Sequence, residues 1–293
     1  MAIAEHLALL QRNPAAWDGW RVQHPHIQPD LSDAQLADHH LAGANLAGVN
    51  LSNADLSHAN LRRVNLERAV LSNASLPFAD LTDARLHQAE LVAVQLFAAT
   101  LTGADLENAN LIGADLRQTN LGDAQLRCAN LIGTNLFRAN LKQADLSLAH
   151  LEQARLNQAI LFNALLHQTN LSKAILHDAE CSGVYCHQTN LQQASLQGAH
   201  FTGAHLFEVD LSGADLSSAD FRWARFYRVN LQGAKLNQTS FRGAWMSRVN
   251  FTGVYLQGSD WSEVTWRGTD LSGAIAAAAV LDQARTPDTD DFK

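Results

Sequence analysis

The sequence predicts an all-β fold, a solenoid whose backbone changes direction every five residues. From Leu31 to Leu281 every fifth residue is apolar, with no residue inserted or deleted. A second series lies two residues before each of these positions and holds Ala, Val, Thr or Ser from Ala34 to Ala279, except at His39. Neither an α-helix, with its period of 3.6, nor a strand, with its period of two, uses a strict period of five. We therefore expect two side chains of every five to point inward and three to point outward.

The glycines mark the position of the turn. Of the 17 glycines, all except Gly19 and Gly122 fall two residues after the large apolar residue. Glycine is favoured where φ is positive or where backbones approach closely, as in a type II turn. The turn therefore has a fixed place in each five-residue unit.

Units such as A-D-L-S-S, A-N-L-I-G and A-D-L-T-D resemble the pentapeptide-repeat family, whose consensus is A-(D/N)-L-x-x. The resemblance covers residues 29–275 and implies a right-handed quadrilateral parallel β-helix with four pentapeptides, or 20 residues, per coil. Like residues also recur at that spacing, which is what coils stacked at ~4.8 Å favour. These ladders are Phe201, Phe221, Phe241 and Trp261, and, with interruptions, Asn110, Asn130, Asn170, Asn190, Asn230 and Asn250. The leader W-D-G-W-R, followed by H-P and P-D-L-S, is similar to leaders of cyanobacterial members.

The solenoid is predicted to carry a cap at each end, because its terminal coils would otherwise expose open sheet edges. Residues 1–28 are expected to form a helical N-terminal cap, with Asn13 and Pro14 starting a second helix that bears Trp17 and Trp20. The repeat then occupies residues 29–275. Residues 276–293 are expected to hold a short helical C-terminal cap, in the Ala-rich segment up to Arg285, and a disordered acidic tail.

Composition narrows the functional classes. The net charge of -8 argues against direct binding of nucleic acid. Three cysteines, Cys128, Cys181 and Cys186, are too few for a disulfide framework and fit a reducing compartment. The N-terminus lacks a basic leader, and no segment approaches the ~20 apolar residues of a membrane span. We expect a cytoplasmic protein.

The sequence contains no catalytic motif, and we predict neither an enzyme nor a cofactor. His167 and His187 lie one coil apart, but no Cys or carboxylate completes a first coordination shell at a familiar spacing, so no metal is expected. Cys181 and Cys186 occupy inward positions, where small apolar side chains suffice. The Asp and Asn residues before the central Leu, such as Asp105, serve the fold according to the family resemblance.

Two outward-facing groups are candidate contact surfaces. The first is a partner-binding patch, because Arg, Trp and Tyr dominate interface hot spots; alternatively, its long side chains only cover the bulky core beneath. Its members are Arg222, Trp223, Arg225, Tyr227, Arg228, Arg242, Trp245, Arg248 and Arg267. The second group is apolar and is equally compatible with scattered surface residues; it comprises Val92, Phe97, Ile112, Ile132 and Phe137.

The predicted function is a non-catalytic scaffold that presents a rigid surface to a protein partner. The alternative is a DNA mimic that binds and protects a type II topoisomerase (gyrase), as quinolone-resistance pentapeptide proteins do. That alternative needs a continuous acidic stripe, whereas Asp and Glu here alternate with Arg on most faces. A homodimer through a terminal cap is a further partner compatible with the sequence.

Overall fold

The computed structural model describes residues 3–12 and 14–275. The chain divides into two compact units, unit 1 (Met1–Ala154) and unit 2 (Arg155–Lys293). No helix among the described residues is long and apolar enough to cross a membrane.

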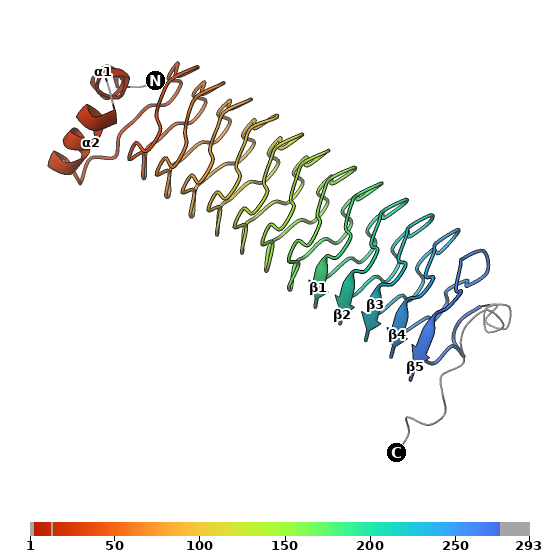
Figure 1. Cartoon of the computed structure of the whole chain (residues 1–293). Coiled ribbons are helices and arrows are strands. Elements are labelled where there is room, and N and C mark those ends of the chain that lie inside the picture. The colour runs from red at the N-terminus through yellow and green to blue at the C-terminus, as the bar shows by residue number, and fades with distance from the viewer. Residues whose placement is uncertain (1–2, 13, 276–293) are drawn as a thin grey trace. The chain divides into compact units, whose positions relative to one another are not determined.

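Unit 1 consists of two helices followed by stacked coils (Figure 1). The helices are α1 (Ala4–Arg12) and α2 (Pro14–Gln23). After them, parallel bridges join residues 20 positions apart on four successive faces: Asp30 with Asn50, Gln35 with Asp55, His40 with Asn60, and Asn45 with Asn65. The offset of 20 residues confirms the prediction of four pentapeptides per coil and a parallel β-solenoid.

Unit 2 continues the same 20-residue register and adds a regular sheet on one face. Its strands are β1 (Tyr185–His187), β2 (His205–Phe207), β3 (Arg225–Tyr227), β4 (Trp245–Ser247) and β5 (Thr265–Arg267). They are parallel and ordered β1-β2-β3-β4-β5, so each strand pairs with the strand one coil later. On the other faces single bridges maintain the same register, for example Asn170 with Asn190.

The turn predicted from the glycines recurs throughout the described coils. In the first coil, the amide of Ala34 donates to Leu31 O at 3.2 Å, and Asp33 between them has a φ of 60°. Fourteen glycines share this positive φ, and so do 34 non-glycine residues at the same place in the repeat. Gly273 is the exception among the glycines at this phase. The turn thus favours glycine without requiring it, because hydrogen bonds to the next coil, such as Asp33 N to Ser52 O at 2.9 Å, hold the backbone.

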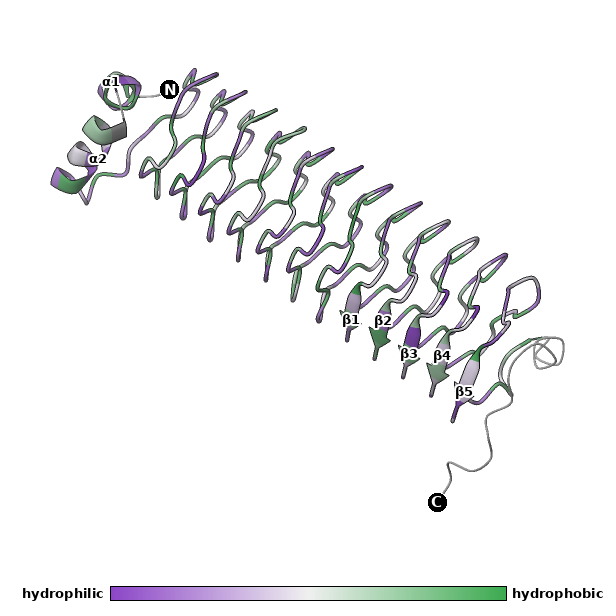
Figure 2. Ribbon diagram, in the orientation of Figure 1, coloured by the Kyte–Doolittle hydropathy of each residue, from purple (hydrophilic) through white to green (hydrophobic). Residues whose placement is uncertain are grey.

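The core is formed by the two inward series, and hydrophobic residues recur along every coil (Figure 2). The central residues and the small residues before them are almost completely buried from Leu31 to Trp266, except His39 and Ser259, which are half-buried. Threonine hydroxyls at the small position donate to backbone carbonyls, as in Thr119 Oγ1 to Leu96 O at 2.9 Å and Thr239 Oγ1 to Leu216 O at 2.8 Å. In unit 2 one column becomes aromatic, and Phe221 stacks between Phe201 and Phe241 at centroid distances of 4.9 and 5.6 Å.

The N-terminal helices supply hydrogen bonds that the first coil lacks because no coil precedes it. The Trp17 indole donates to Asn45 O at 2.7 Å, and Asp18 accepts from Asn45 N at 2.9 Å. Arg21 donates to Ala47 O at 2.7 Å. Trp17 is fully buried. These contacts satisfy open-edge groups that would otherwise pair with another chain. The predicted C-terminal cap and tail, residues 276–293, lie outside the described residues.

Candidate interaction surface

The sheet of unit 2 presents two outward columns, because the middle residue of each strand faces the core and its two neighbours lie on the opposite side of the backbone. These neighbours are exposed or half-buried, except Ser247, which is buried. The first column holds Tyr185, His205, Arg225, Trp245 and Thr265, and the second holds His187, Phe207, Tyr227, Ser247 and Arg267. We call this surface the β1–β5 face.

Aromatic rings line the first coils of the β1–β5 face. Tyr185 stacks on His205 with centroids 4.8 Å apart and an interplanar angle of 9°. His205 in turn lies 6.2 Å from Phe207, and Phe207 lies 6.3 Å from Tyr227. His187 stacks on His167 at 4.8 Å, with the two Nδ1 atoms 2.8 Å apart. Contacts therefore run both along the columns and across them.

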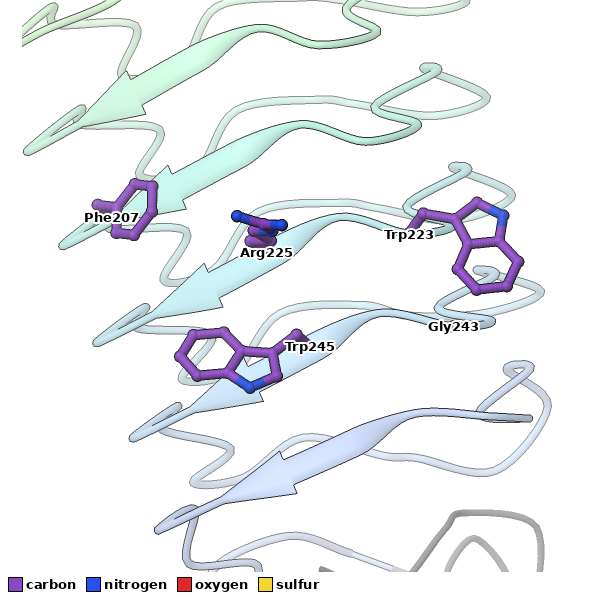
Figure 3. A pocket seen from close by; sticks show the side chains of 5 residues that line it. All are labelled: Phe207, Trp223, Arg225, Gly243 and Trp245. Carbon is purple, nitrogen blue, oxygen red and sulfur yellow. The ribbon is translucent and has the colours of Figure 1, made fainter.

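Three members of the predicted patch meet at one depression of about 640 Å³. Trp223, Arg225 and Trp245 line it together with Phe207 and Gly243 (Figure 3). Arg225 and Trp245 come from β3 and β4, and Trp223 stands on the turn that precedes β3. We call this depression the Trp223–Trp245 pocket. It is open to solvent, and its lining is mostly apolar.

Sequence reasoning missed Phe207 and Gly243. Phe207 lies one coil before Tyr227 in the second column, so the 20-residue spacing was a usable signal. Gly243 lies one coil after Trp223, and a Cβ built on Gly243 would overlap the six-membered ring of Trp223. The absence of a side chain at this position lets the Trp223 indole lie over the next coil, where it stays 57% exposed.

The other predicted arginines are mostly engaged within unit 2. Arg222 pairs with Asp220 at 2.7 Å, Arg228 with Glu208 at 2.9 Å and Arg242 with Glu263 at 2.8 Å. Arg228 also lies over the ring of Tyr227, 5.1 Å from its centroid. Arg267 ends β5. Arg225 and Arg248 have no ion pair in the part of the chain that the structure describes.

These contacts shift several pKa values. Burial alone would raise the pKa of Asp220, but hydrogen bonds from Arg222 and its charge outweigh burial and lower it. The pKa of Glu208 is lowered by hydrogen bonds from Gln188 and Arg228. Burial, followed by the positive charge of Arg225, lowers the pKa of His205. His205 therefore stays neutral to lower pH, and Arg225 remains the dominant charge of the pocket.

The second predicted surface, in unit 1, is less exposed than the first. Only Ile112 of its five members is exposed, at 39%; Val92, Phe97, Ile132 and Phe137 are half-buried. Phe97 packs edge-on against Phe78 at 5.5 Å, and Arg117 lies 5.6 Å from the Phe97 centroid. Arg138 covers Phe137 at 5.0 Å. Phe78, which is 52% exposed, is the prominent apolar side chain that the sequence patterns did not single out.

Carboxylates before the central Leu stabilise the turns. Asp55 accepts a hydrogen bond from the Ser57 hydroxyl and another, at 3.0 Å, from the Ser57 amide. These bonds lower the pKa of Asp55. Asp105 likewise accepts from Glu107 N at 3.0 Å. The expected structural role of this position is therefore visible in its contacts.

The remaining reactive side chains are scattered. Burial raises the pKa of Cys186 to about 12 and that of Cys181 well above its usual range, so neither thiol ionises at neutral pH. In unit 1, His87, Asp105 and Glu107 bring ligand atoms within 4.8 Å of one another, a grouping that the sequence analysis did not identify. His87 lies 18 positions before Asp105 and 20 before Glu107, so the coil length of 20 residues is the sequence signal that places the three side chains together.

Comparison with known proteins agrees with the repeat pattern. The family model for pentapeptide repeats (8 copies) matches overlapping segments that together span residues 30–285. No curated protein matches the chain. Among solved structures, HetL of the cyanobacterium Nostoc sp. strain PCC 7120, a pentapeptide repeat protein involved in heterocyst differentiation regulation, is 29% identical; the match covers 88% of this chain and 98% of HetL, with a TM-score of 0.36. QnrB1, a plasmid-mediated fluoroquinolone resistance protein, is 18% identical over 61% of this chain and 90% of its own, with a TM-score of 0.44.

Proposed function

The chain belongs to the pentapeptide repeat family, and we propose that it acts as a non-catalytic protein-binding module through the β1–β5 face and its flanking turns. One observation carries the proposal. Trp, Tyr, Phe and Arg side chains that are exposed or half-buried gather on one regular sheet face and its flanking turns. Phe207, Trp223, Arg225 and Trp245 among them line the open Trp223–Trp245 pocket. These residue types supply most of the binding energy at protein interfaces.

The backbone beneath this face is rigid, which favours binding. Each strand is hydrogen-bonded to its neighbours in a fixed register, and the Phe and Trp core column packs behind it. Binding of a partner therefore requires little ordering of this surface, and the entropic cost of association is small. The nearby acidic groups Asp220, Glu208 and Glu263 are held in ion pairs. For that reason this face does not support the alternative of a DNA mimic, which requires a continuous stripe of unpaired carboxylates.

Affinity purification of the full chain from its native cell tests the proposal. The test variant is Trp223→Gln/Arg225→Gln, since Gln already occupies many equivalent turn positions at positive φ. The matched control is Phe78→Gln, because Phe78 has a φ of 58° against 62° for Trp223 and a similar exposure, but lies in unit 1.

We expect a partner that wild type and Phe78→Gln retain and the double variant loses. A partner set identical for all three proteins would refute the role of this face. If the recovered partner is a gyrase subunit, and its recovery requires acidic side chains of this chain and not Trp223 and Arg225, the result would favour the topoisomerase alternative.

A further inference from the structure

The Trp223–Trp245 pocket combines apolar walls with one cation. Phe207, Trp223 and Trp245 provide the walls, and the exposed Arg225 side chain lies between the rings of neighbouring coils (Figure 3). Because Arg225 has no ion pair within the described residues, its five N–H donors are available to an acceptor from outside. Arg225 is exposed in the free protein, and an apolar side chain bound beside it would exclude solvent and strengthen its pair with a carboxylate.

The charges around the pocket leave an excess of positive charge. Three nearby carboxylates are each paired with an arginine: Asp220 with Arg222, Glu208 with Arg228 and Glu263 with Arg242. Arg225 and Arg248 remain without such a partner in the described part of unit 2. A complementary ligand must therefore bring a carboxylate of its own.

We propose that the pocket binds an acidic peptide segment of the protein partner, with a large apolar side chain next to a carboxylate. The apolar side chain lies against Trp223 and Trp245, and the carboxylate accepts a bidentate pair of hydrogen bonds from Arg225. This inference rests on the proposed function, and it adds the chemistry of the partner.

Single-stranded nucleic acid, which also stacks on aromatic rings, fits the surface less well. Such ligands need cations that follow the phosphate backbone over several nucleotides. On this face Arg222, Arg228 and Arg242 are already paired with carboxylates of this chain, which leaves too few cations for a phosphate track. An oligonucleotide is therefore the competing outcome to test.

Gly243 determines the position of the Trp223 ring in the pocket. A Cβ on Gly243 would overlap the Trp223 ring and meets no atom of Arg225, so Gly243→Ala should displace the indole without removing the Arg225 charge. This variant separates the contribution of the aromatic wall from that of the charge.

The experiment uses a displayed library of random 12-residue peptides selected on the full chain. We expect enriched sequences with Asp or Glu within two positions of Leu, Phe or Trp. Affinity of a synthetic selected peptide should fall about tenfold or more in Arg225→Gln, the size expected for losing a charged hydrogen-bonded pair. It should fall several-fold in Gly243→Ala. Arg155→Gln removes the same charge from an exposed position of unit 2 outside the predicted patch and should change affinity less than about twofold.

Several results would overturn the inference. The first is a selection that enriches either no shared sequence or a basic one. The second is an equal loss of affinity in Arg225→Gln and Arg155→Gln. The third is full retention of affinity when the acidic residue of the peptide is changed to its amide. Tighter binding of a 20-nucleotide poly(dT) probe through Trp223 and Arg225 would replace the peptide with nucleic acid. If the cellular partner is lost in Trp223→Gln/Arg225→Gln while no acidic peptide is selected, the protein-binding role stands and only this inference fails.

Discussion

Corresponding pentapeptides of the two units build their turn differently, and the difference explains where the candidate surface lies. In unit 1 the inner small residue donates to the preceding central carbonyl, as in Ala69 N to Leu66 O at 3.0 Å. In unit 2 the corresponding pentapeptides recur every 20 residues. From the one centred on Cys186 onward, the described chain lacks this hydrogen bond, and the central residue and its two neighbours form a strand.

An unbroken stack of β-branched inner residues accompanies the change, whereas single β-branched inner residues elsewhere, such as Val64 and Val254, keep the bond. In this series the unit 1 residues from Ala69 to Ala149 are alanines with bonds of 3.0 Å, whereas Val49 has a bond of 3.2 Å and Thr169, in unit 2, one of 3.4 Å. The next residues, all β-branched and all without the bond, are Thr189, Val209, Val229, Val249 and Thr269. Stacked β-branched side chains favour extended backbone. The strand conformation in turn creates the two outward columns of the β1–β5 face.

The largest expected effect comes from breaking the period itself. One residue inserted between Gly133 and Thr134 shifts every later central residue of unit 1 from the inside to the outside. We expect the variant to lose cooperative thermal unfolding, as measured by circular dichroism. The same residue added after Gln11, outside the coils, is the control. A soluble insertion variant with a wild-type melting profile would contradict a strictly periodic coil.

Core truncation compares the two interiors directly. Leu131→Ala in unit 1 should cost about 2–5 kcal/mol, and Phe221→Ala in unit 2 about 3–5 kcal/mol, because stacked coils cannot collapse around a cavity. Phe221 also loses its stacking on Phe201 and Phe241. Urea denaturation measures both costs. A loss below about 1 kcal/mol in Leu131→Ala would mean that Leu131 does not fill the core.

Val229→Ala tests whether β-branching opens the turn. The smaller residue should allow its amide to donate to Phe226 O, as the alanines of unit 1 do, at a cost of about 1–2 kcal/mol in lost packing. Hydrogen exchange at residue 229 should become slower relative to neighbouring amides, despite the lower global stability. Val64→Ala is the control, since Val64 already has its bond to Leu61 O at 3.1 Å. Unchanged relative protection at residue 229 would disprove the explanation.

Acid should weaken both units through the turn carboxylates. Hydrogen bonds from Ser57 lower the pKa of Asp55 in the folded state. The resulting stabilisation is therefore present above about pH 4, where the unfolded carboxyl ionises, and is lost as pH falls through the folded-state pKa. Asp55→Asn keeps an acceptor oxygen but cannot titrate. Urea denaturation from pH 5 to pH 2 should show a smaller loss in the variant, by less than about 1 kcal/mol. Identical pH profiles would count against the role of this bond.

The backbone was more predictable from the sequence than the surface, for a physical reason. A side chain at an inward position can only pack into the core, so the period of five correctly predicts that Leu131 and Phe221 are buried. An outward side chain can adopt several rotamers, and each rotamer brings it into contact with different neighbours. The diagonal contact of His205 with Phe207, the position of Trp223 over Gly243, and the pairing of Arg242 with Glu263 depend on rotamers that no period specifies. Whether the nine patch residues bind a partner stays a prediction.

The smallest stability effect should come from two glycines in the same turn conformation. Gly113 and Gly243 have φ values of 65° and 69°, but a Cβ on Gly113 meets nothing within 4 Å, whereas one on Gly243 meets Trp223. Both alanine variants should lose no more than about 1 kcal/mol, because alanine already occupies this conformation at Ala93 and Ala98. Only Gly243→Ala should shift tryptophan fluorescence, since the displaced ring belongs to Trp223. Equal spectra for the two variants would mean that Trp223 does not lie over Gly243, and the aromatic wall of the pocket would need a different explanation.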